Sequence, residues 1–488
     1  MSGSIEAVRG MRDLLPSAQQ RSAARTRAQI EACIAEHGYQ PIDLPIIESR
    51  ELYLRKLGEE LAGKIYEFNF GGRDLALRPE WTASVLRAYV AHLQDQPLPL
   101  RLSYNGPVFR YERPQNLTYR QFTQVGVELL GGLAPRADAE VLALACAGLD
   151  VAGVQGYRVI VGHIGLVRSL LSSLKLTDRT RGLLLWSLER LRSEGVAAVR
   201  TRLNEQLGPA ELDLPLPEGV ADDEAAQLLL RVFQATQVDL ASGTRSPDEI
   251  VGRLLRKLRR SDPQPEIDRA LDLLDQLCAI RGPAAEALPR LAALLNGAEI
   301  ASPAYAELRT VLQLLEAHGV SRERVLIDFS LGGRGLHYYS GFIFEIYDQT
   351  DMQLCGGGRY DELVLALGAR QTLPAAGFAY GLERVTAAAE RSGPPLERNP
   401  PEALVIAVDD ESYGYALEVA QRLRGRGYIT TLDVRNRKLA DNLRDAARRA
   451  LGSVIIVGIE ERSSETLIWR DLASRDERRM RLDELGDR

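Results

Sequence analysis

This chain of 488 residues has few cysteines, no long apolar run and no excess of positive charge. The four cysteines lie far apart and form no C-x-x-C pair: Cys33, Cys146, Cys278 and Cys355. This spacing argues against a disulfide framework and a zinc knuckle, and it predicts reduced, mostly buried thiols. No apolar run approaches ~20 residues, and the first residues lack the hydrophobic core of a signal peptide. We therefore expect a cytoplasmic protein that does not span a membrane.

The charge balance gives the molecule as a whole no cationic field. Its 61 basic and 67 acidic side chains leave a formal charge of −6, so any contact with nucleic acid must be local. Hydrophobic residues make up 45% and charged residues 26%, which is the balance of a soluble globular protein with a sizeable core. The length predicts two or three compact domains.

The first third of the chain combines helices with short strands. Apolar residues on one face predict an amphipathic helix from Ser17 to His37, and the pattern returns to helix from Trp81 to Leu93. Short runs rich in Ile, Leu, Tyr and Phe predict strands between these helices. Residues 101–114 and 119–131 predict a hairpin of two charged strands around a polar loop.

The rest of the chain predicts an interrupted α+β domain followed by an α/β domain. Residues 157–321 are rich in Leu, Ala and Arg at helical spacing, which predicts a mostly helical insertion. Strand character resumes in residues 322–390, so the insertion splits a sheet whose first part belongs to residues 1–156. Prolines in residues 391–401 predict a linker. Residues 402–488 alternate as βαβαβ, which predicts a parallel or mixed sheet with helices on its faces.

The charged hairpin is the most informative segment. Alternate residues of a strand share a face, so Arg110 and Glu112 should lie together, and the return strand adds Gln124 and Glu128 nearby. Guanidinium, carboxylate and amide groups on one surface suit a ligand that carries phosphate, amine and carboxylate groups. A solvated hairpin with cross-strand ion pairs is the alternative that spacing leaves open.

Five ordered motifs resemble the signatures of the histidyl-tRNA synthetase family, a branch of the class II aminoacyl-tRNA synthetases. These motifs are LRPEWTA at 77–83, FRYERPQ with YRQFTQVGVE at 109–128, GGRGLHYYSG at 332–341, GGGRYDEL at 356–363 and GFAYGLERV at 377–385. Pro45 resembles the proline that this class places at its dimer interface. The resemblance covers residues 5–150 and 322–488. It implies an antiparallel catalytic sheet flanked by helices and a C-terminal anticodon-binding domain.

The resemblance implies an ATP site built largely from arginines. Arg110 would hold the α-phosphate, Arg384 the γ-phosphate and Glu112 the adenine amino group. Arg334 would stabilise the charge that builds on the α-phosphate during attack, which makes Arg334, Arg110 and Gln124 the implied catalytic residues. Mg²⁺ would bridge the phosphates. No metal bound by the protein itself is expected, because no histidine cluster has metal-ligand spacing.

The resemblance also implies a pocket for histidine. The residues implied there are Glu80, Thr82, Gln124, Glu128, Tyr339 and Gly357. Glu80 would accept the α-ammonium group and Gln124 would meet the carboxylate. Glu128 and Tyr339 would hydrogen-bond the two imidazole nitrogens. Gly357 would belong to the pocket floor, because glycine permits close backbone approach, although a mere turn is the alternative.

The sequence departs from the pattern of the family at several positions. Gln115 to Thr118 form the hairpin loop where the family usually has a glycine and further basic residues. Trp81 replaces a usual glycine, and His337 replaces a frequent aspartate. The insertion lacks the family's asparagine-proline-leucine-arginine signature, and the segments around its start resemble the paralogous regulatory subunit of ATP phosphoribosyltransferase.

Two functions follow from these resemblances. The first is ATP-dependent activation of histidine to histidyl-adenylate and its transfer to tRNA(His) by a homodimer that holds tRNA through its acceptor end and its C-terminal domain. The alternative is an inactive histidine-sensing subunit that controls an ATP phosphoribosyltransferase catalytic subunit. A full nucleotide site favours the first, and an adenylating enzyme with another acceptor is a third hypothesis. The basic residues from Arg435 to Arg449 predict either an anticodon-stem contact or a solvated helix face.

Overall fold

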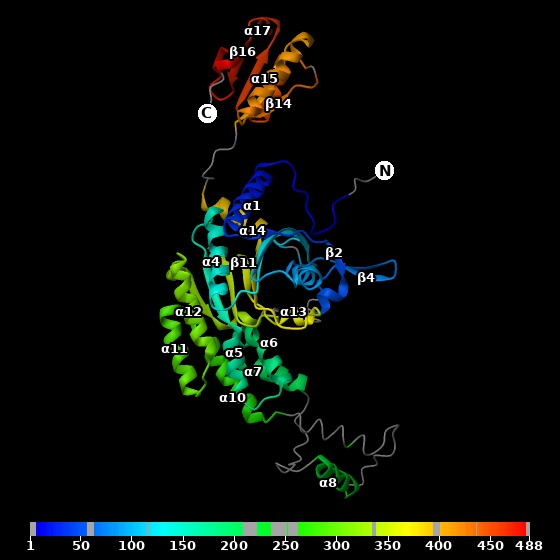
Figure 1. The fold of residues 1–488 in the computed structure, drawn as a ribbon, viewed down its shortest axis with the longest axis vertical. Helices are drawn as coiled ribbons and strands as arrows, with labels where there is room; N and C mark the ends of the chain where they lie inside the picture. The colour runs from blue at the N-terminus through cyan, green and yellow to red at the C-terminus, as the bar shows by residue number, and fades with distance from the viewer. Residues whose placement is uncertain are drawn as a thin grey trace. The chain divides into compact units, whose positions relative to one another are not determined.

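The computed structural model describes residues 6–55, 63–113, 115, 117–207, 222–235, 251, 262–333, 338–393, 401–435 and 437–484. The chain divides into two compact units, Met1–Pro394 and Pro395–Arg488 (Figure 1). Within the described ranges, no helix is long and apolar enough to cross a membrane. All four cysteines are free and buried, and their burial confirms that part of the expectation.

A nine-stranded sheet forms the centre of the first unit, in the order β1-β5-β6-β12-β11-β10-β7-β9-β8. Its strands are β1 (Gln40–Pro41), β5 (Leu100–Phe109), β6 (Gln121–Leu130), β7 (Arg158–His163), β8 (Arg281–Pro283), β9 (Val325–Asp328), β10 (Phe342–Tyr347), β11 (Gln353–Arg359) and β12 (Ala375–Gly381). The pairs β1–β5 and β7–β9 are parallel, and the other pairs are antiparallel. The expected antiparallel sheet is thus confirmed at its centre, and it becomes mixed toward its edges.

The predicted charged hairpin is confirmed as β5 and β6, which pair with Phe109 opposite Gln121. On its other side β6 pairs with β12, and this places Gly377 opposite Glu128 and Gly381 opposite Gln124. Segments far apart in the sequence therefore become neighbours in the centre of the sheet. This register brings two of the recognised motifs side by side.

Helices cover the sheet and carry its apolar core (Figure 1). They are α1 (Ala18–Glu36), α3 (Thr82–Ala88), α4 (Arg136–Val151), α13 (Leu363–Ala366) and α14 (Leu382–Ser392). The expected first helix begins after Ser17, whose hydroxyl accepts a hydrogen bond from the amide of Gln20 and so caps the helix. The second expected helix is α3 followed by one π-helical segment, η1 (Tyr89–Leu93).

A separate three-stranded sheet lies in the same unit, in the order β2-β4-β3. Its strands are β2 (Ile47–Ser49), β3 (Glu67–Phe70) and β4 (Arg73–Leu77). The hydrophobic side chains of Ile46, Ile47, Phe68 and Phe70 are exposed on and beside these strands. An exposed apolar group of this kind is typical of an interaction surface.

The helical insertion contains α5 (Ile164–Ser172), α6 (Asp178–Trp186), α7 (Leu188–Leu207), α8 (Asp222–Ala235), α10 (Gln264–Cys278), α11 (Ala284–Gly297) and α12 (Pro303–Ala317). The boundary expected at residue 157 differs from the structure, because β7 and β8 lie beyond it and belong to the large sheet. β7 is apolar enough to be buried between β10 and β9. In α7, Gly195 adopts a φ of 82°, so the helix is kinked there.

The second unit confirms the predicted βαβαβ order. It comprises β13 (Glu402–Ala407), α15 (Tyr413–Gly425), β14 (Ile429–Leu432), α16 (Leu439–Arg448), β15 (Ser453–Val457), α17 (Ile459–Ser463), β16 (Thr466–Asp471) and β17 (Glu477–Arg481). β13 runs parallel to both β14 and β15. The last two strands extend the sheet as an antiparallel edge that the sequence analysis did not anticipate.

Four 3-10 turns complete the described elements: η2 (Arg322–Arg324), η3 (Phe329–Gly333), η4 (Asp410–Ser412) and η5 (Leu482–Glu484).

Candidate active site

One large cavity, of about 730 Å³, opens in the first unit. The sheet, α3, η3, the loop before β6 and the insertion helices α6 and α7 all contribute lining residues. Most of the residues predicted at the two ligand sites line it: Glu80, Thr82, Arg110, Glu112, Gln124, Tyr339, Gly357 and Arg384. Residues from all five recognised motifs therefore converge on one space.

Arg110 follows β5 and lies on the cavity wall. Its Nε donates to the carbonyl of Pro79 at 2.8 Å, and its Cζ lies 5.4 Å from the ring centre of Phe122. Among the described residues, no carboxylate forms an ion pair with this guanidinium. A guanidinium held by a carbonyl and a ring keeps its full charge for an anionic ligand.

Arg384 lies in the first turn of α14 and is held entirely by neutral acceptors. Its Nε donates to the carbonyl of Leu117 at 3.3 Å, its Nη1 to the carbonyl of Gln353 at 3.2 Å and its Nη2 to Oγ1 of Thr118 at 3.3 Å. The hairpin loop, which lacks the basic residues usual in the family, therefore supplies acceptors that orient this arginine. Its charge, too, has no carboxylate partner in the described part of the chain.

Glu112 lies at the mouth of the cavity and is half-exposed. Its Oε1 lies 3.8 Å from Nζ of Lys64, which is a loose ion pair. Its backbone is better fixed, because its carbonyl accepts a hydrogen bond from Nε of Arg120 at 3.2 Å. The carboxylate is therefore able to turn toward a ligand while the backbone keeps its place.

Glu80 is buried immediately before α3, where its carboxylate caps the helix. Oε2 accepts from the amide of Thr82 at 2.8 Å and Oε1 from the amide of Ala83 at 3.0 Å. A carboxylate fixed by two amides at a helix N-terminus is a preorganised anion. Thr82 lies beside it on the cavity wall.

Gln124 has a buried polar atom that the described residues leave unsatisfied. Its side chain is buried on β6 and its Oε1 has no hydrogen-bond partner among the described residues. An unpaired buried acceptor costs about 1–3 kcal/mol, so a ligand that donates an N–H would be favoured here. The residue lines the cavity, which makes such a donor accessible.

Glu128 is the one described candidate that does not line the cavity. The hydroxyl of Tyr104 donates to its Oε1 at 3.2 Å, and the hydroxyl of Tyr360 donates to its Oε2. Both tyrosines line the cavity, so they lie between this buried carboxylate and the open space. Burial and then the charge of Glu128 raise the pKa of both phenols well above the ordinary value, which keeps them neutral donors.

Tyr339 lines the cavity beside Tyr338, with ring centres 4.6 Å apart. Its ring is buried, whereas Tyr338 is half-buried. Burial raises the pKa of Tyr339 well above its ordinary value. Tyr338 lines the cavity as well, so both rings of this pair face the open space.

Gly357 lies on β11, where the neighbouring strands leave no room for a side chain. A Cβ there would collide with the carbonyl of Gly377 and with the side chains of Phe378 and Phe344. The glycine is thus required for packing within the sheet, and its backbone is left as part of the cavity floor.

Trp81 does not fill the cavity, although it replaces a glycine of the family pattern. Its indole is 1% exposed and stacks on the ring of Tyr104, with centres 5.0 Å apart and planes 8° apart. The Cζ of Arg78 lies 3.4 Å from the indole centre. Gly106 makes room for the indole, because a Cβ at that position would meet it. Trp81 therefore supports a tyrosine of the cavity wall from behind.

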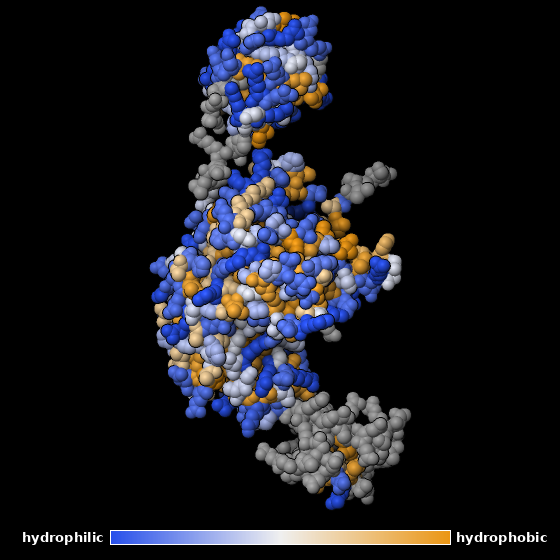
Figure 2. Space-filling view, viewed as in Figure 1, coloured by the Kyte–Doolittle hydropathy of each residue, from blue (hydrophilic) through white to orange (hydrophobic). Residues whose placement is uncertain are grey.

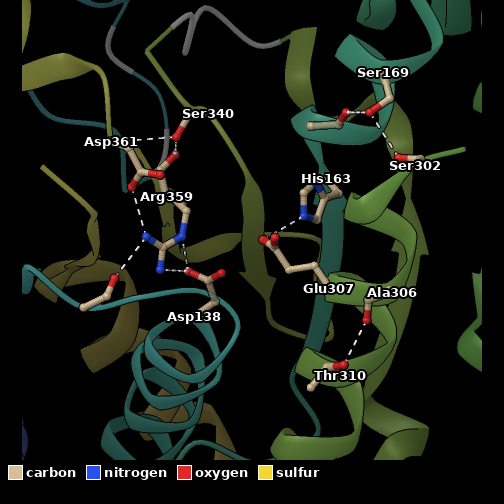
Figure 3. Close-up of polar contacts among 12 residues, drawn as sticks. Asp138, His163, Ser169, Ser302, Ala306, Glu307, Thr310, Ser340, Arg359 and Asp361 are labelled. Atoms are coloured by element: carbon tan, nitrogen blue, oxygen red, sulfur yellow. Dashed lines mark hydrogen bonds and ion pairs between the residues drawn. The ribbon is translucent and has the colours of Figure 1, made fainter. Parts of the chain in front are cut away.

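The sequence analysis did not predict the buried hydrogen-bond network that supports Tyr360. Nε of Arg359 donates to Oδ1 of Asp138 at 2.8 Å and its Nη1 donates to Oδ1 of Asp361 at 2.9 Å (Figure 3). The amide of Asp361 in turn donates to the hydroxyl of Ser340 at 3.0 Å. Arg359, Tyr360 and Asp361 belong to the GGGRYDEL motif, and this motif was the signal from which the network could have been predicted. This buried network fixes the turn on which Tyr360 lies.

The insertion also contributes to the cavity, which no local pattern of residues predicts. Its lining residues are Leu183, Trp186, Ser187, Glu189, Arg190, Arg202 and Gln206. They belong to α6, α7 and the residue between them. One wall of the cavity is therefore helical and basic.

Two predicted residues, Arg334 and His337, lie outside the described residues. Their neighbour Leu331 lines the cavity, so the chain reaches the site just before them. In the described ranges, no group of three or more His, Cys, Asp or Glu side chains is arranged to hold a metal ion.

The basic residues of the second unit are largely engaged with neighbouring acids. Asp445 lies within ion-pair distance of Arg437 at 3.4 Å, Arg448 at 2.7 Å and Arg449 at 3.8 Å. Arg444 pairs with Asp441 on the same helix. These pairs describe a solvated helix face, which was one of the two alternatives for this segment.

Comparison with known proteins agrees with this geometry. Residues 10–275 and 252–385 match the family model described as Histidyl-tRNA synthetase, and residues 402–488 match that of the Anticodon binding domain. The chain is 31% identical to the histidine–tRNA ligase of Methanocaldococcus jannaschii, over 98% of this chain and 97% of the relative. It is 31% identical to that of Pyrococcus horikoshii, over 99% and 98%.

Solved structures show the same fold. The histidyl-tRNA synthetase from Nostoc sp. matches with a TM-score of 0.71 at 20% identity, covering 98% of this chain and 97% of that one. A structure described as an ATP phosphoribosyltransferase regulatory subunit/histidyl-tRNA synthetase from Bacillus halodurans matches with a TM-score of 0.67 at 24% identity, covering 94% and 99%.

A sheet-based cavity lined by arginines that pair with no carboxylate of the described residues, in a chain whose other unit matches an anticodon-binding domain, is typical of an aminoacyl-tRNA synthetase. The motifs, the family match and the full-length relatives then specify which aminoacyl-tRNA synthetase family this is. The chain belongs to the histidyl-tRNA synthetase family.

Proposed function

We propose that this protein is a histidine–tRNA ligase, which activates histidine with ATP and transfers it to tRNA(His). One observation supports this above all. Arg110 and Arg384, with no carboxylate partner in the described residues, share a cavity with Glu80 and the unsatisfied oxygen of Gln124. The phosphate groups of ATP are complementary to the two arginines, and the ammonium group of an amino acid is complementary to the carboxylate and the amide oxygen.

The nucleotide would be bound by the arginine side of the cavity. Arg110 would hold the α-phosphate and Arg384 the γ-phosphate, because both guanidiniums have no competing carboxylate among the described residues. Glu112 would accept the adenine amino group. Arg334 would stabilise charge on the α-phosphate. Mg²⁺ would be bound through the phosphates, whose oxygens are the ligands that this ion prefers.

Histidine would be bound by the carboxylate side of the cavity. Glu80 would accept the α-ammonium group, which is attracted by a carboxylate already fixed at the start of α3. Gln124 would meet the substrate carboxylate through its amide N–H, and its unsatisfied Oε1 would accept an N–H from the α-ammonium group. Tyr339 would contact the imidazole, and Glu128 would act on the ring through the hydroxyls of Tyr104 and Tyr360. Thr82 and Gly357 would complete the pocket wall and floor.

The chemistry would rest on positioning and electrostatics. An oxygen of the histidine carboxylate attacks the α-phosphorus of ATP, the bond to the β-phosphate oxygen breaks, and pyrophosphate leaves. A ribose hydroxyl of the tRNA then attacks the carbonyl carbon, and AMP leaves. Arg110 would neutralise charge that develops at phosphorus in the first step.

The remaining partners follow from this activity. The acceptor end of tRNA(His) would enter the cavity, and the second unit would contact the anticodon, in line with its match to an anticodon-binding family. Arg435 and Lys438 are among the basic side chains of that unit that form no ion pair in the described residues, so they could contact phosphates. Because tRNA is charged where it is used, the protein would act in the cytoplasm.

We also propose a homodimer. The exposed Ile46, Ile47, Phe68 and Phe70 cluster on the three-stranded sheet. Figure 2 shows hydrophobic residues on the side of the first unit that carries β2 and β4. Burying this surface against a second copy would remove it from water.

Histidine-dependent exchange of labelled pyrophosphate into ATP tests the proposal. We expect exchange by the wild type and its loss in Arg110→Ala. Arg101→Gln is the control, because Arg101 lies on β5, the strand that Arg110 follows, but pairs with Glu140 at 2.8 Å and does not line the cavity. Histidine binding without exchange, together with co-purification of a phosphoribosyltransferase, would instead establish the regulatory alternative.

A further inference from the structure

Asp328, the last residue of β9, is a buried carboxylate that joins three elements. It is 5% exposed. Its Oδ1 accepts two hydrogen bonds from Ser330, from the amide at 2.9 Å and from the hydroxyl at 2.6 Å. These bonds form an Asx-type turn that fixes the start of η3.

The other oxygen of Asp328 is bound by two arginines from different parts of the insertion. Nη1 of Arg192, on α7, lies 3.3 Å from Oδ2, and Nε of Arg281, on β8, lies 3.2 Å from it. Arg192 also donates to the hydroxyl of Ser330 at 3.3 Å. Arg192 is therefore bonded both to the end of β9 and to η3, whereas no such bond from Arg281 to Ser330 is found in the described residues.

α7 and η3 are both walls of the cavity. Leu331 of η3 lines it, and so do Glu189 and Arg190 of α7. The kink at Gly195 separates these α7 residues from the rest of the helix. The first segment of α7, Leu188–Glu194, thus presents residues to the cavity and Arg192 to Asp328.

We propose that the Arg192–Asp328–Ser330 contact is a positioning device for adenylate formation. It would set the first segment of α7 and the η3 turn in the arrangement that the reacting groups require. Asp328 and Arg192 would be positioning residues, not catalytic ones. The proposal rests on the proposed function, because it concerns the rate of that reaction.

The two arginines allow positioning to be separated from folding. Removing either one leaves Asp328 with the other, so the buried carboxylate keeps a cationic partner in both cases. Only the loss of Arg192 removes a polar bond between α7 and η3. A small displacement of the groups around a reacting centre lowers the reaction rate far more than it lowers the free energy of unfolding.

Pyrophosphate exchange kinetics of Arg192→Gln and Arg281→Gln test this inference. We expect Arg192→Gln to lower kcat about tenfold while the KM for histidine changes less than about twofold. We expect Arg281→Gln to leave both within about twofold, with a similar thermal midpoint in the two variants. Arg192→Lys, which retains a cation, should recover part of the lost kcat.

Equal kinetics of Arg192→Gln and Arg281→Gln in an active protein would overturn the positioning role alone. Absence of exchange in the wild type would overturn the proposed function and this inference together. Should Arg192→Gln fail to fold, Ser330→Ala decides the question, because it removes the hydroxyl shared by Arg192 and Asp328. A kcat unchanged in Ser330→Ala would then count against the proposal, and a lowered kcat at unchanged KM would support it.

Discussion

The carboxylate of Glu128 occupies the space that a side chain at Gly377 would need. The two residues face each other across β6 and β12, and a Cβ on Gly377 would collide with Oε2 of Glu128. The glycine thereby permits a buried carboxylate to lie between the hydroxyls of Tyr104 and Tyr360. The absence of a side chain at Gly377 thus allows a carboxylate to set the polarity of the inner cavity wall.

Gly377→Ala is therefore expected to weaken histidine binding. The added methyl must displace the Glu128 carboxylate and with it the two tyrosine hydroxyls. Overpacking of this kind costs about 1–3 kcal/mol of folding stability, and we expect the displaced carboxylate to lower the affinity for histidine about tenfold. Calorimetric titration with histidine measures the change. Gly182→Ala is the control, since its Cβ would meet nothing within 4 Å and its affinity should equal that of the wild type.

Arg384→Ala should raise the KM for ATP at least about tenfold, because a bound phosphate would lose a charge-assisted bond. Arg384→Lys should restore little of this, since one ammonium cannot replace three N–H groups that bond Leu117, Thr118 and Gln353. Exchange kinetics at varied ATP give the result. Arg391→Gln on the same helix should behave as the wild type, because Arg391 pairs with Asp348 away from the cavity. Equal KM values for Arg384→Ala and Arg391→Gln would remove Arg384 from the ATP site.

Trp81→Ala should destabilise the first unit by about 3–5 kcal/mol, because it removes a buried indole from between Tyr104 and Arg78. Chemical denaturation followed by tryptophan fluorescence or circular dichroism measures the loss. Trp186→Ala provides the comparison, because that indole is 49% exposed and its truncation should cost less. A smaller loss for Trp81 than for Trp186 would contradict the supporting role of the indole.

The stability of the first unit should fall in acid in part through Glu307. The hydrogen bond from His163, 3.2 Å long, is the main reason that the pKa of Glu307 lies below its ordinary value of 4.5 (Figure 3). A carboxyl group with a lowered folded pKa contributes stability above its unfolded pKa, and this is lost as the pH falls through the folded value. Urea unfolding of Glu307→Gln should therefore show a flatter decline below about pH 4.5 than the wild type. Glu286→Gln, an exposed change on α11, should retain the wild-type decline, and identical curves for all three proteins would refute the assignment.

Ile47→Arg should convert the proposed dimer into monomers. Ile47 is 50% exposed within the apolar group on the three-stranded sheet, and a buried unpaired charge at an interface is costly. Sedimentation velocity of the full chain distinguishes the two states. Val434→Arg is the control, because Val434 is 80% exposed in the other unit and should leave the mass unchanged. A wild type that sediments as a monomer would contradict the dimer.

Local sequence patterns predicted the elements around the site well. The alternation in residues 101–131 predicted β5 and β6, because strand periodicity is a local property. The βαβαβ order of the second unit followed from the same kind of signal. The strand β16 was missed although Leu467 and Trp469 alternate with more exposed neighbours, which was a usable signal.

Details that depend on packing between distant segments were not predictable. The screening of Glu128 by Tyr104 and Tyr360 depends on rotamers set by three strands, which the spacing of motifs does not contain. The wall formed by α7 depends on how the insertion folds back, which no local pattern encodes. Arg110, Gln124 and Arg384 do line one cavity, and their roles remain predictions for the experiments above.

The order of the strands has a consequence for synthesis on the ribosome. β10, β11 and β12 lie between β6 and β7 in the sheet, yet they follow the whole insertion in the chain. A nascent chain that ends before residue 322 therefore leaves one side of β6 and both sides of β7 open, with their unpaired N–H and C=O groups exposed to other chains, because β9 to β12 are still missing. Such edges favour aggregation until these four strands emerge and insert. The nascent protein should consequently depend on holding chaperones until translation of this segment is complete.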